Sequence, residues 1–311
     1  MTHRQAGGGV ASPWGPLQVA DAHVHFFSHR FFSLLAAQKP GLTFDQMGAL
    51  LGWTMPPEDP AALAEAWVHE LDKRGVARAA LIASLPGDEE SVLAAVAAHP
   101  RRFWGYFMVN PRAADTVARV QGALDRGMHA VCFFPAMHGY YMHDDAAMAV
   151  IDVIAATRPA ALVFVHCGVL SVGVRPKLGL SSPFDMRYSN PIDLHGVALR
   201  FPHVRFVIPH FGAGYFREAL MLAELCPNVF LDTSSSNKWM HYEGLDLRHV
   251  FRRALDLLGP KRLLFGSDSS FFPRGWNAAI FEAQAKALYE LGVEAKDANL
   301  LFGENLTRLL G

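Results

Sequence analysis

The chain has 311 residues, of which 51% are hydrophobic and 18% charged, so it is too apolar and too weakly charged to be disordered. Its 28 Lys and Arg residues nearly balance 29 Asp and Glu residues and form no basic stripe, which argues against a nucleic-acid partner. The apolar stretches are interrupted too soon for a membrane span, so we expect no membrane partner. The three cysteines lack metal-site spacing, and a reducing, cytoplasmic location fits them best.

Residues 1–16 contain three consecutive glycines and no apolar core, so we expect a loose leader rather than a signal peptide. From residue 17 to residue 311, short β-branched or aromatic runs alternate with longer helical patterns, and no linker divides the chain. The expected strands are residues 19–25, 76–83, 103–109, 130–134, 161–166, 204–209, 229–232 and 262–265. The expected helices are residues 60–74, 89–98, 114–125, 146–157, 192–200, 215–225, 247–258 and 277–291.

Strand-then-helix units repeated along the whole chain indicate an α/β fold, a single (β/α)8 barrel, whose usual size is about 250 residues. An open doubly wound sheet is the alternative, but the chain has no G-x-G-x-x-G after a strand. The additional length lies in two insertions, residues 26–60 after strand 1 and residues 168–191 after strand 5. In a barrel both would cover the face that carries active sites, as a lid or as packing decoration.

Histidines and one aspartate stand at the carboxyl ends of four expected strands. Strand 1 ends with His23 and His25, strand 5 with His166, strand 6 with His210, and the text after strand 8 contains Asp268. His23 and His25 are two residues apart, so both project from the same side of their strand, into the barrel. Each residue alone is more often a packing or capping residue, but five of them on one rim are typical of a metal site.

Imidazole and carboxylate ligands suit Zn²⁺, our first expectation, and also Mn, Fe or Ni, and a catalytic site needs only three or four of them. If His23, His25, His166 and Asp268 hold one divalent metal ion, His210 remains as a proton carrier beside the ligands. Asp268 is ambiguous, because it can bind the metal and also take a proton from water. We therefore predict His210 and Asp268 as the catalytic residues.

The sequence around these residues resembles that of the amidohydrolase superfamily. It is most similar to the amidohydrolase-related branch, which includes aminocarboxymuconate-semialdehyde decarboxylase and several lactonases. The resemblance spans about residues 19–310 and is carried by residues 23–25, 165–166, 201–214, 226–233, 266–268 and 302–310. It implies a barrel with one divalent metal on the four ligands named above, with His210 polarising or deprotonating water. It also suggests a dimer or larger homo-oligomer. Binuclear members carry a carboxylated lysine at the end of strand 4, and residues 130–134 contain no lysine, so we expect no second metal.

Four further residues are candidates for binding a small-molecule substrate. His138 follows strand 4, Arg175 and Arg187 lie in the insertion after strand 5, and Arg274 lies six residues after Asp268. The arginines can pair with a substrate carboxylate, although each can equally be an ordinary loop charge. Phe26, Phe27 and Trp53 are candidates for an aromatic wall or for the core.

The leading hypothesis is a metal-dependent hydrolase in which activated water attacks a small lactone, amide or ester of an organic acid. The alternative is a metal-dependent, non-oxidative decarboxylase of the same family, which shares every ligand named above and would need a cationic anchor for an acidic substrate. A third hypothesis, an inactive barrel that keeps its histidines for stability, predicts no stoichiometric metal.

Overall fold

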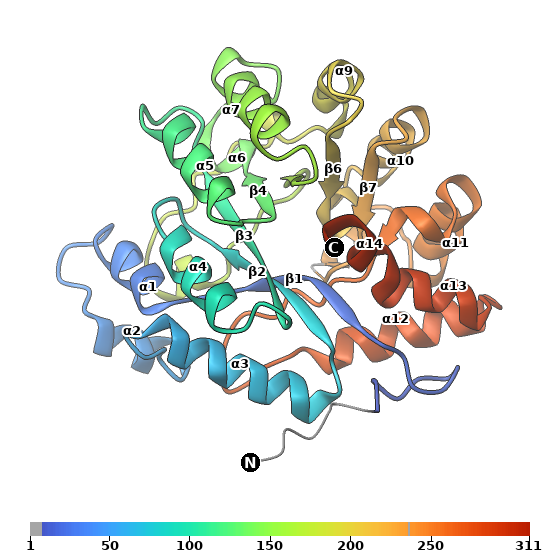
Figure 1. Cartoon of the computed structure of the whole chain (residues 1–311), viewed down its shortest axis with the longest axis horizontal. Coiled ribbons are helices and arrows are strands. Elements are labelled where there is room, and N and C mark those ends of the chain that lie inside the picture. Colours follow the sequence, from blue (N-terminus) through green and yellow to red (C-terminus); the bar gives the residue numbers. More distant parts are fainter. Residues whose placement is uncertain (1–7, 236) are drawn as a thin grey trace.

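Eight parallel strands form one sheet, hydrogen-bonded in chain order from β1 to β8, in the computed structural model, which describes residues 8–235 and 237–311 (Figure 1). The strands are β1 (Ala20–His25), β2 (Arg78–Ala83), β3 (Phe103–Val109), β4 (Ala130–Phe133), β5 (Leu162–Val165), β6 (Arg205–Ile208), β7 (Val229–Asp232) and β8 (Leu263–Leu264). Hydrogen bonds from Ala22 N to Phe265 O (2.8 Å) and from His25 N to Ser269 O (2.7 Å) join the segment directly after the last strand to the first strand. The predicted (β/α)8 barrel is confirmed.

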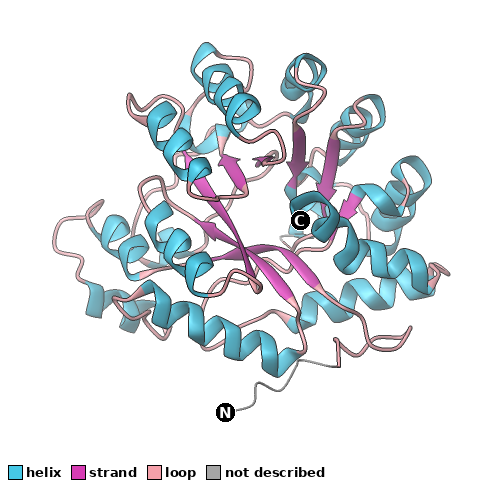
Figure 2. Ribbon diagram, in the orientation of Figure 1, coloured by secondary structure: helices cyan, strands magenta, loops and turns pink. Residues whose placement is uncertain are grey.

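Helices surround the strands (Figure 2). The longer ones are α3 (Pro60–Arg74), α4 (Glu89–Ala98), α5 (Thr116–Asp125), α7 (Asp145–Thr157), α10 (Phe216–Leu225), α11 (Leu247–Leu258) and α12 (Ala278–Glu290). The shorter ones are α1 (His29–Ala36), α2 (Phe44–Leu51), α6 (Pro135–His138), α8 (Val174–Lys177), α9 (His195–Arg200), α13 (Ala295–Asn299) and α14 (Asn305–Leu310). Among the residues that the structure describes, no helix combines the length and apolar content that a membrane span requires.

The apolar core has two layers, one between the strands and the helices and one inside the barrel. The inner layer consists of alternate strand residues, such as Trp104, Tyr106 and Met108 of β3. Leu306 and Leu309 of α14 belong to this inner layer, and Arg205, the first residue of β6, donates to the Leu309 carbonyl at 3.2 Å, so α14 covers the amino-terminal end of the barrel. The carboxyl-terminal end is therefore the end left for a site, as in other barrels of this type.

An extra residue in β1 decides which of its side chains face the interior. Asp21 is opposite Ala79 but Val24 is opposite Leu81, so three steps along β1 match two along β2. Ala22 belongs to the inner core layer, and plain alternation from there would turn His23 outward. The bulge shifts the alternation by one residue, so that His23 and His25 both reach the cavity at the carboxyl end.

The segment expected to be a loose leader is packed against the barrel from residue 9 onward, and residues 1–7 lie outside the described part. Val10 and Leu17 form a two-residue antiparallel bridge, with N–O distances of 2.8 and 2.9 Å. The Trp14 indole donates to the Val293 carbonyl at 2.8 Å and its ring packs edge-on against Tyr289. The described part of this segment is therefore packed, and its apolar residues are too isolated in the sequence to show periodicity.

The segments after β1 and β5 pack together over the carboxyl-terminal end. Helices α1, α2 and α8 share a hydrophobic cluster of their own, separate from the two barrel layers. Arg175 Nη1 of α8 donates to Gln38 Oε1 at 2.8 Å, and Lys39 Nζ donates to the Leu178 carbonyl at 3.0 Å. Residues 26–60 and 168–191 thus form one cover over the carboxyl-terminal end of the barrel, and the two segments together are named the roof.

A buried carboxylate, Asp88, fixes the start of this roof. Its oxygens accept hydrogen bonds from Ser28 Oγ at 2.8 and 2.9 Å and from Ser91 Oγ at 2.6 Å. Ser28 in turn accepts the backbone N–H of Phe31 as the N-cap of α1. Burial raises the pKa of Asp88 to about 6, although the hydrogen bonds from Ser91 and Ser28 oppose the shift.

We expect Asp88→Asn to flatten the dependence of folding stability on pH. The folded pKa lies above the unfolded one, so the wild-type protein binds more protons when folded and loses stability as the pH rises from about 4 to about 7. The loss from this one group is at most about 3 kcal/mol. Thermal unfolding across this pH range measures the slope in both proteins. Parallel curves for the two proteins would contradict the shifted pKa, whatever the offset between them.

Candidate metal centre

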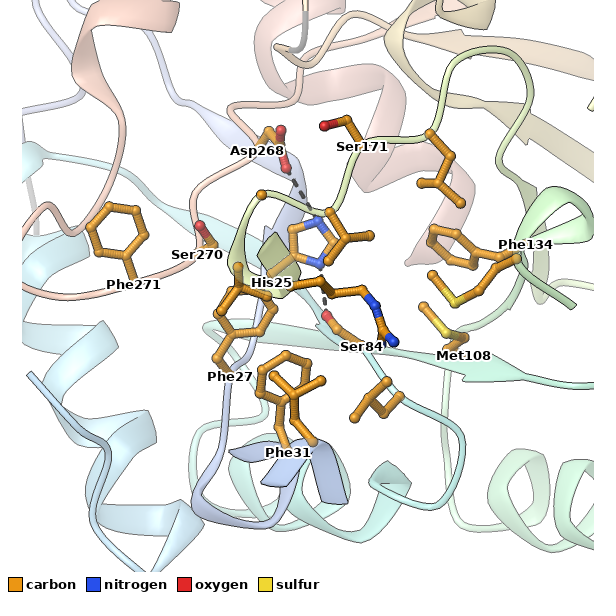
Figure 3. A pocket seen from close by; sticks show the side chains of 18 of the residues that line it. His25, Phe27, Phe31, Ser84, Met108, Phe134, Ser171, Asp268, Ser270 and Phe271 are labelled. Atoms are coloured by element: carbon orange, nitrogen blue, oxygen red, sulfur yellow. Dashed lines mark hydrogen bonds and ion pairs between the residues drawn. The ribbon is translucent and has the colours of Figure 1, made fainter. Parts of the chain in front are cut away.

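Three ligand atoms from β1 and from the segment after β8 converge at the carboxyl end of the barrel. His23 Nε2 lies 3.3 Å from His25 Nε2, and Asp268 Oδ1 lies 3.2 Å from His25 Nε2 and 3.8 Å from His23 Nε2. Figure 3 shows His25 between Asp268 and Ser84, with the cavity in front of it. Within residues 8–235 and 237–311, this is the one group of three or more His, Cys, Asp or Glu ligand atoms close enough to share a metal ion.

Hydrogen bonds behind the two imidazoles turn their Nε2 lone pairs toward this point. His23 Nδ1 lies 2.7 Å from Asp232 Oδ2, and a carboxylate can only accept, so the hydrogen is on Nδ1. His25 Nδ1 lies 2.7 Å from Ser84 Oγ, whose own hydrogen goes to the Ile82 carbonyl at 3.0 Å. His25 therefore also carries its hydrogen on Nδ1. Two imidazole lone pairs and a carboxylate oxygen facing one another fit a divalent cation.

The carboxylates around the cluster favour a proton on His23, whereas burial lowers the pKa of His25. Burial opposes a charge on His23, but Asp232, Asp268 and Asp21 together raise its pKa. Burial alone would also raise the pKa of Asp268, yet the neighbouring imidazoles of His25, His23 and His210 hold it well below the usual range. The carboxylate is thus ionised, and the site attracts a cation, as a proton or as a metal ion.

His166 lies next to this cluster without joining it. Its ring lines the cavity and is 5% exposed, but it is not one of the three converging ligands. Its Nδ1 is buried and has no hydrogen-bond partner among the described residues. Burial lowers its pKa well below the usual value, so the imidazole is neutral. An unpaired nitrogen of a neutral, buried imidazole is consistent with a fourth ligand that the metal would draw in.

His210 stands on the other side of His23, with ring centroids 5.0 Å apart. Its Nδ1 lies 2.9 Å from Ser234 Oγ. Its backbone has φ +55°, and Asp268 has the same value, which is uncommon for residues other than glycine. Such strain concentrates at functional sites, where the surrounding structure holds it in place. Both predicted catalytic residues therefore have strained backbone, in the segments that follow β6 and β8.

Close packing behind the ligands depends on Gly266. A Cβ built there would lie 2.6 Å from Asp232 Oδ1, 2.8 Å from Ser234 Cβ and 2.9 Å from His23 Cβ. The absent side chain thus allows β8 to approach the residues that support His23.

A cavity of about 320 Å³ opens in front of the cluster and below the roof. Aromatic side chains form much of its wall, and Trp53 stacks on Phe271 with centroids 4.1 Å apart and planes at 6°. Figure 3 shows Phe27 and Phe31 on one side of His25, with Met108 and Phe134 on the other. Phe27 and Trp53 thus belong to the cavity wall, whereas Phe26 is fully buried in the core.

The four predicted substrate-binding residues divide into two pairs. Arg175 and Arg274 line the cavity, and so does Lys177. Arg187 is 78% exposed and paired with Asp185 on the surface, and the structure does not bring it to the cavity. His138 ends α6 with its ring parallel to that of Tyr140, and it is not on the cavity wall either; its neighbour Met137 is.

Three residues that hydrogen-bond to the histidines of the site were not predicted from the sequence: Ser84 after β2, Asp232 at the end of β7 and Ser234 two residues later. All three stand at the carboxyl ends of strands, as the predicted ligands do. Reading polar residues at every strand end, rather than histidines and the acidic residue after β8, would have found them.

The family model described as Amidohydrolase matches residues 20–311. The chain belongs to the amidohydrolase family. A curated relative, Protein fluG of Emericella nidulans, is 34% identical over 85 residues, which cover 27% of this chain and 10% of that protein. This amidohydrolase therefore spans about a tenth of the length of the curated relative that it matches.

Solved structures with the same fold include proteins of both reaction types. A 5-carboxyvanillate decarboxylase from Novosphingobium aromaticivorans with bound manganese is 14% identical, with a TM-score of 0.64 over 97% of this chain and 99% of that chain. A probable 2-pyrone-4,6-dicarboxylic acid hydrolase from Acinetobacter baumannii is 14% identical, with a TM-score of 0.61 over 95% and 100%. An amidohydrolase from Burkholderia multivorans with bound zinc is 18% identical, with a TM-score of 0.63 over 94% and 98%. At these identities the likeness shows the fold.

We expect Asp232→Asn to weaken zinc binding by about 100-fold and Ser84→Ala by about tenfold. In Asp232→Asn the amide oxygen would keep the Ser234 N–H, so the amide nitrogen would donate to His23 Nδ1 and move the imidazole hydrogen to Nε2. Ser84→Ala only leaves the His25 Nδ1 hydrogen without an acceptor. Competition with a chromophoric chelator measures both affinities. Ser91→Ala, which removes a serine hydroxyl away from the cluster, is the control, and wild-type affinity in Asp232→Asn would contradict the assigned hydrogen positions.

Proposed function

We propose that this amidohydrolase is a metal-dependent hydrolase that cleaves a small lactone, amide or ester of an organic acid. The observation that carries the proposal is the convergence of His23 Nε2, His25 Nε2 and Asp268 Oδ1 on one point of the cavity wall. The cluster attracts a cation and opens into a largely apolar cavity. Such a site suits the activation of a water molecule for attack on a carbonyl group.

His23, His25, Asp268 and His166 would hold one divalent ion. Zn²⁺ is our first choice, with Mn, Fe or Ni as the other candidates for the same donor set. A bound ion would supply Lewis acidity for the carbonyl and would lower the pKa of water toward 7. Strand β4 contains no lysine that a binuclear site could carboxylate, and this favours one ion per chain.

Side chains of the protein would accept the proton, bind the substrate and exclude water. The ionised Asp268 carboxylate would accept a proton from water, and His210, which lines the same cavity, would contact the reacting group. Arg175 and Arg274 would bind a substrate carboxylate, since both line the cavity. The aromatic wall would exclude water from the substrate's apolar part.

A non-oxidative decarboxylase is the second candidate, because of the cations that line this cavity. Arg175, Lys177 and Arg274 accompany stacked aromatic rings there, and an aromatic carboxylate would match both features. Decarboxylation would need the same cluster but would release CO₂ instead of consuming water. The experiment that separates the two is a parallel screen of lactones, amides and esters against aromatic carboxylates, with acid release and CO₂ release as readouts. Turnover of an aromatic carboxylate with CO₂ release, and of no ester, lactone or amide, would replace the hydrolase proposal.

We expect purified protein to contain about one divalent metal per chain, as a mononuclear catalytic site requires. The double variant His23→Ala/His25→Ala should lose it, and Asp268→Asn and His166→Ala should lose most of it together with turnover. His210→Ala should keep the metal and lose activity. Elemental analysis and activity measure the two properties separately, with His143→Ala, which does not line this cavity, as the control. Loss of metal from His210→Ala as complete as from His166→Ala would overturn the separation of ligand from proton carrier.

A further inference from the structure

The Ser234 hydroxyl lies between two imidazoles of the site. Ser234 Oγ is 3.0 Å from His23 Nδ1 and 2.9 Å from His210 Nδ1, and the serine is fully buried at the end of β7. Its backbone N–H donates to Asp232 Oδ1 at 2.5 Å, which holds the residue against the carboxylate behind His23. One serine therefore contacts both a metal-ligand histidine and the histidine beside the cluster.

The hydrogens on His23 Nδ1 and on the Ser234 hydroxyl determine the direction of these contacts. His23 Nδ1 already carries a hydrogen, because it faces the Asp232 carboxylate, so it cannot accept one from Ser234. Among the described residues, His210 Nδ1 is then the one acceptor within reach of the Ser234 hydroxyl hydrogen. The opposite arrangement, with the hydrogen on His210 Nδ1, would leave that hydroxyl hydrogen buried without an acceptor, which proteins rarely tolerate.

We propose that Ser234 is a positioning residue that donates to His210 Nδ1 and thereby places the single imidazole hydrogen of His210 on Nε2, facing the cavity. This inference rests on the proposed function for its catalytic meaning, but the hydrogen positions do not depend on the reaction. His210 would then donate a hydrogen bond to the substrate carbonyl or to the charge that develops on it, and would not act as the base. Asp268 remains as the acceptor for the proton of water.

The first test reads the hydrogen positions directly and needs no substrate. Long-range ¹H–¹⁵N NMR spectra of the zinc-loaded, ¹⁵N-histidine-labelled protein at mildly alkaline pH distinguish a bare imidazole nitrogen from a protonated one. The His210 signals are those that disappear in His210→Gln. We expect a bare Nδ1 and a protonated Nε2 for His210 in the wild type, and a mixture of both forms in Ser234→Ala. Ser91→Ala, another serine hydroxyl removed elsewhere, should leave the His210 signals unchanged.

Two results of this test would overturn the proposal. A protonated Nδ1 of His210 in the wild type would refute the direction of the hydrogen bond. A wild-type pattern in folded Ser234→Ala would refute the role of Ser234. The wild-type spectrum decides the first question even if Ser234→Ala does not fold.

The second test compares two side chains of equal size at position 210. Gln can donate a hydrogen bond from the place of Nε2, whereas Glu can only accept there. If His210 is a donor, His210→Gln should retain at least about tenfold more kcat/KM than His210→Glu, within a total loss of about 100- to 1000-fold for His210→Ala. Higher activity of His210→Glu would show a base and overturn the donor role. If no substrate is turned over by the wild type, the proposed function fails while the NMR test still decides the hydrogen positions.

Discussion

Negative charge buried among the histidines is the constraint on which the rest of the site depends. Asp232 behind His23 is fully buried, and Asp268 in front of it is held ionised by the imidazoles. Removing two carboxylates from water is costly unless positive charge or hydrogen-bond donors compensate them. The hydrogen on His23 Nδ1 provides part of this compensation for Asp232, and it turns the Nε2 lone pair of His23 toward the side of Asp268, where a cation would compensate the second carboxylate. The arrangement that satisfies Asp232 thus creates the place for a cation.

The barrel and the clustering of His23, His25 and Asp268 could be predicted from the sequence because their signals are local. Parallel strands covered on both faces are continuous apolar runs, and the observed strands lie within the expected ranges, as β3 and β7 show without any shift. The direction of His23 and His25 was correctly expected, yet the spacing that suggested it only requires them to share a side. The bulge between Asp21 and Val24 makes that side the interior, and no Gly or Pro in the strand marks it.

Contacts between distant segments explain what the sequence could not show. Helices α1 and α2 bury their apolar residues against α8, more than a hundred residues later, so neither segment has a complete pattern of its own. The same roof decides which loop residues reach the cavity. Arg175 does so while two of its nitrogens bind Gln38 and the Ser181 carbonyl, whereas Arg187, in the same insertion, pairs locally with Asp185. Composition alone cannot distinguish these two arginines.

The hydrogen bonds of Ser234 determine the hydrogen position on His210, which neither the sequence motif nor the geometry of the cluster shows. Hydrolases and decarboxylases share this fold, so the fold does not decide the reaction and the arrangement of protons and charges around the site must do so. Ser234 contacts the Nδ1 atoms of both His23 and His210. The hydrogen positions on these two imidazoles are therefore coupled through one hydroxyl. If His210 faces the substrate with a hydrogen on Nε2, it stabilises negative charge on oxygen in either reaction, as a tetrahedral adduct in hydrolysis or as an enolate-like or phenolate oxygen in decarboxylation. The choice between the two reactions then depends on the cationic and aromatic wall, where Arg274 lies over Phe271 and Phe271 stacks on Trp53. The loops after β1, β5 and β8, which carry this wall, would therefore set the specificity of the barrel, rather than the residues proposed to hold the metal.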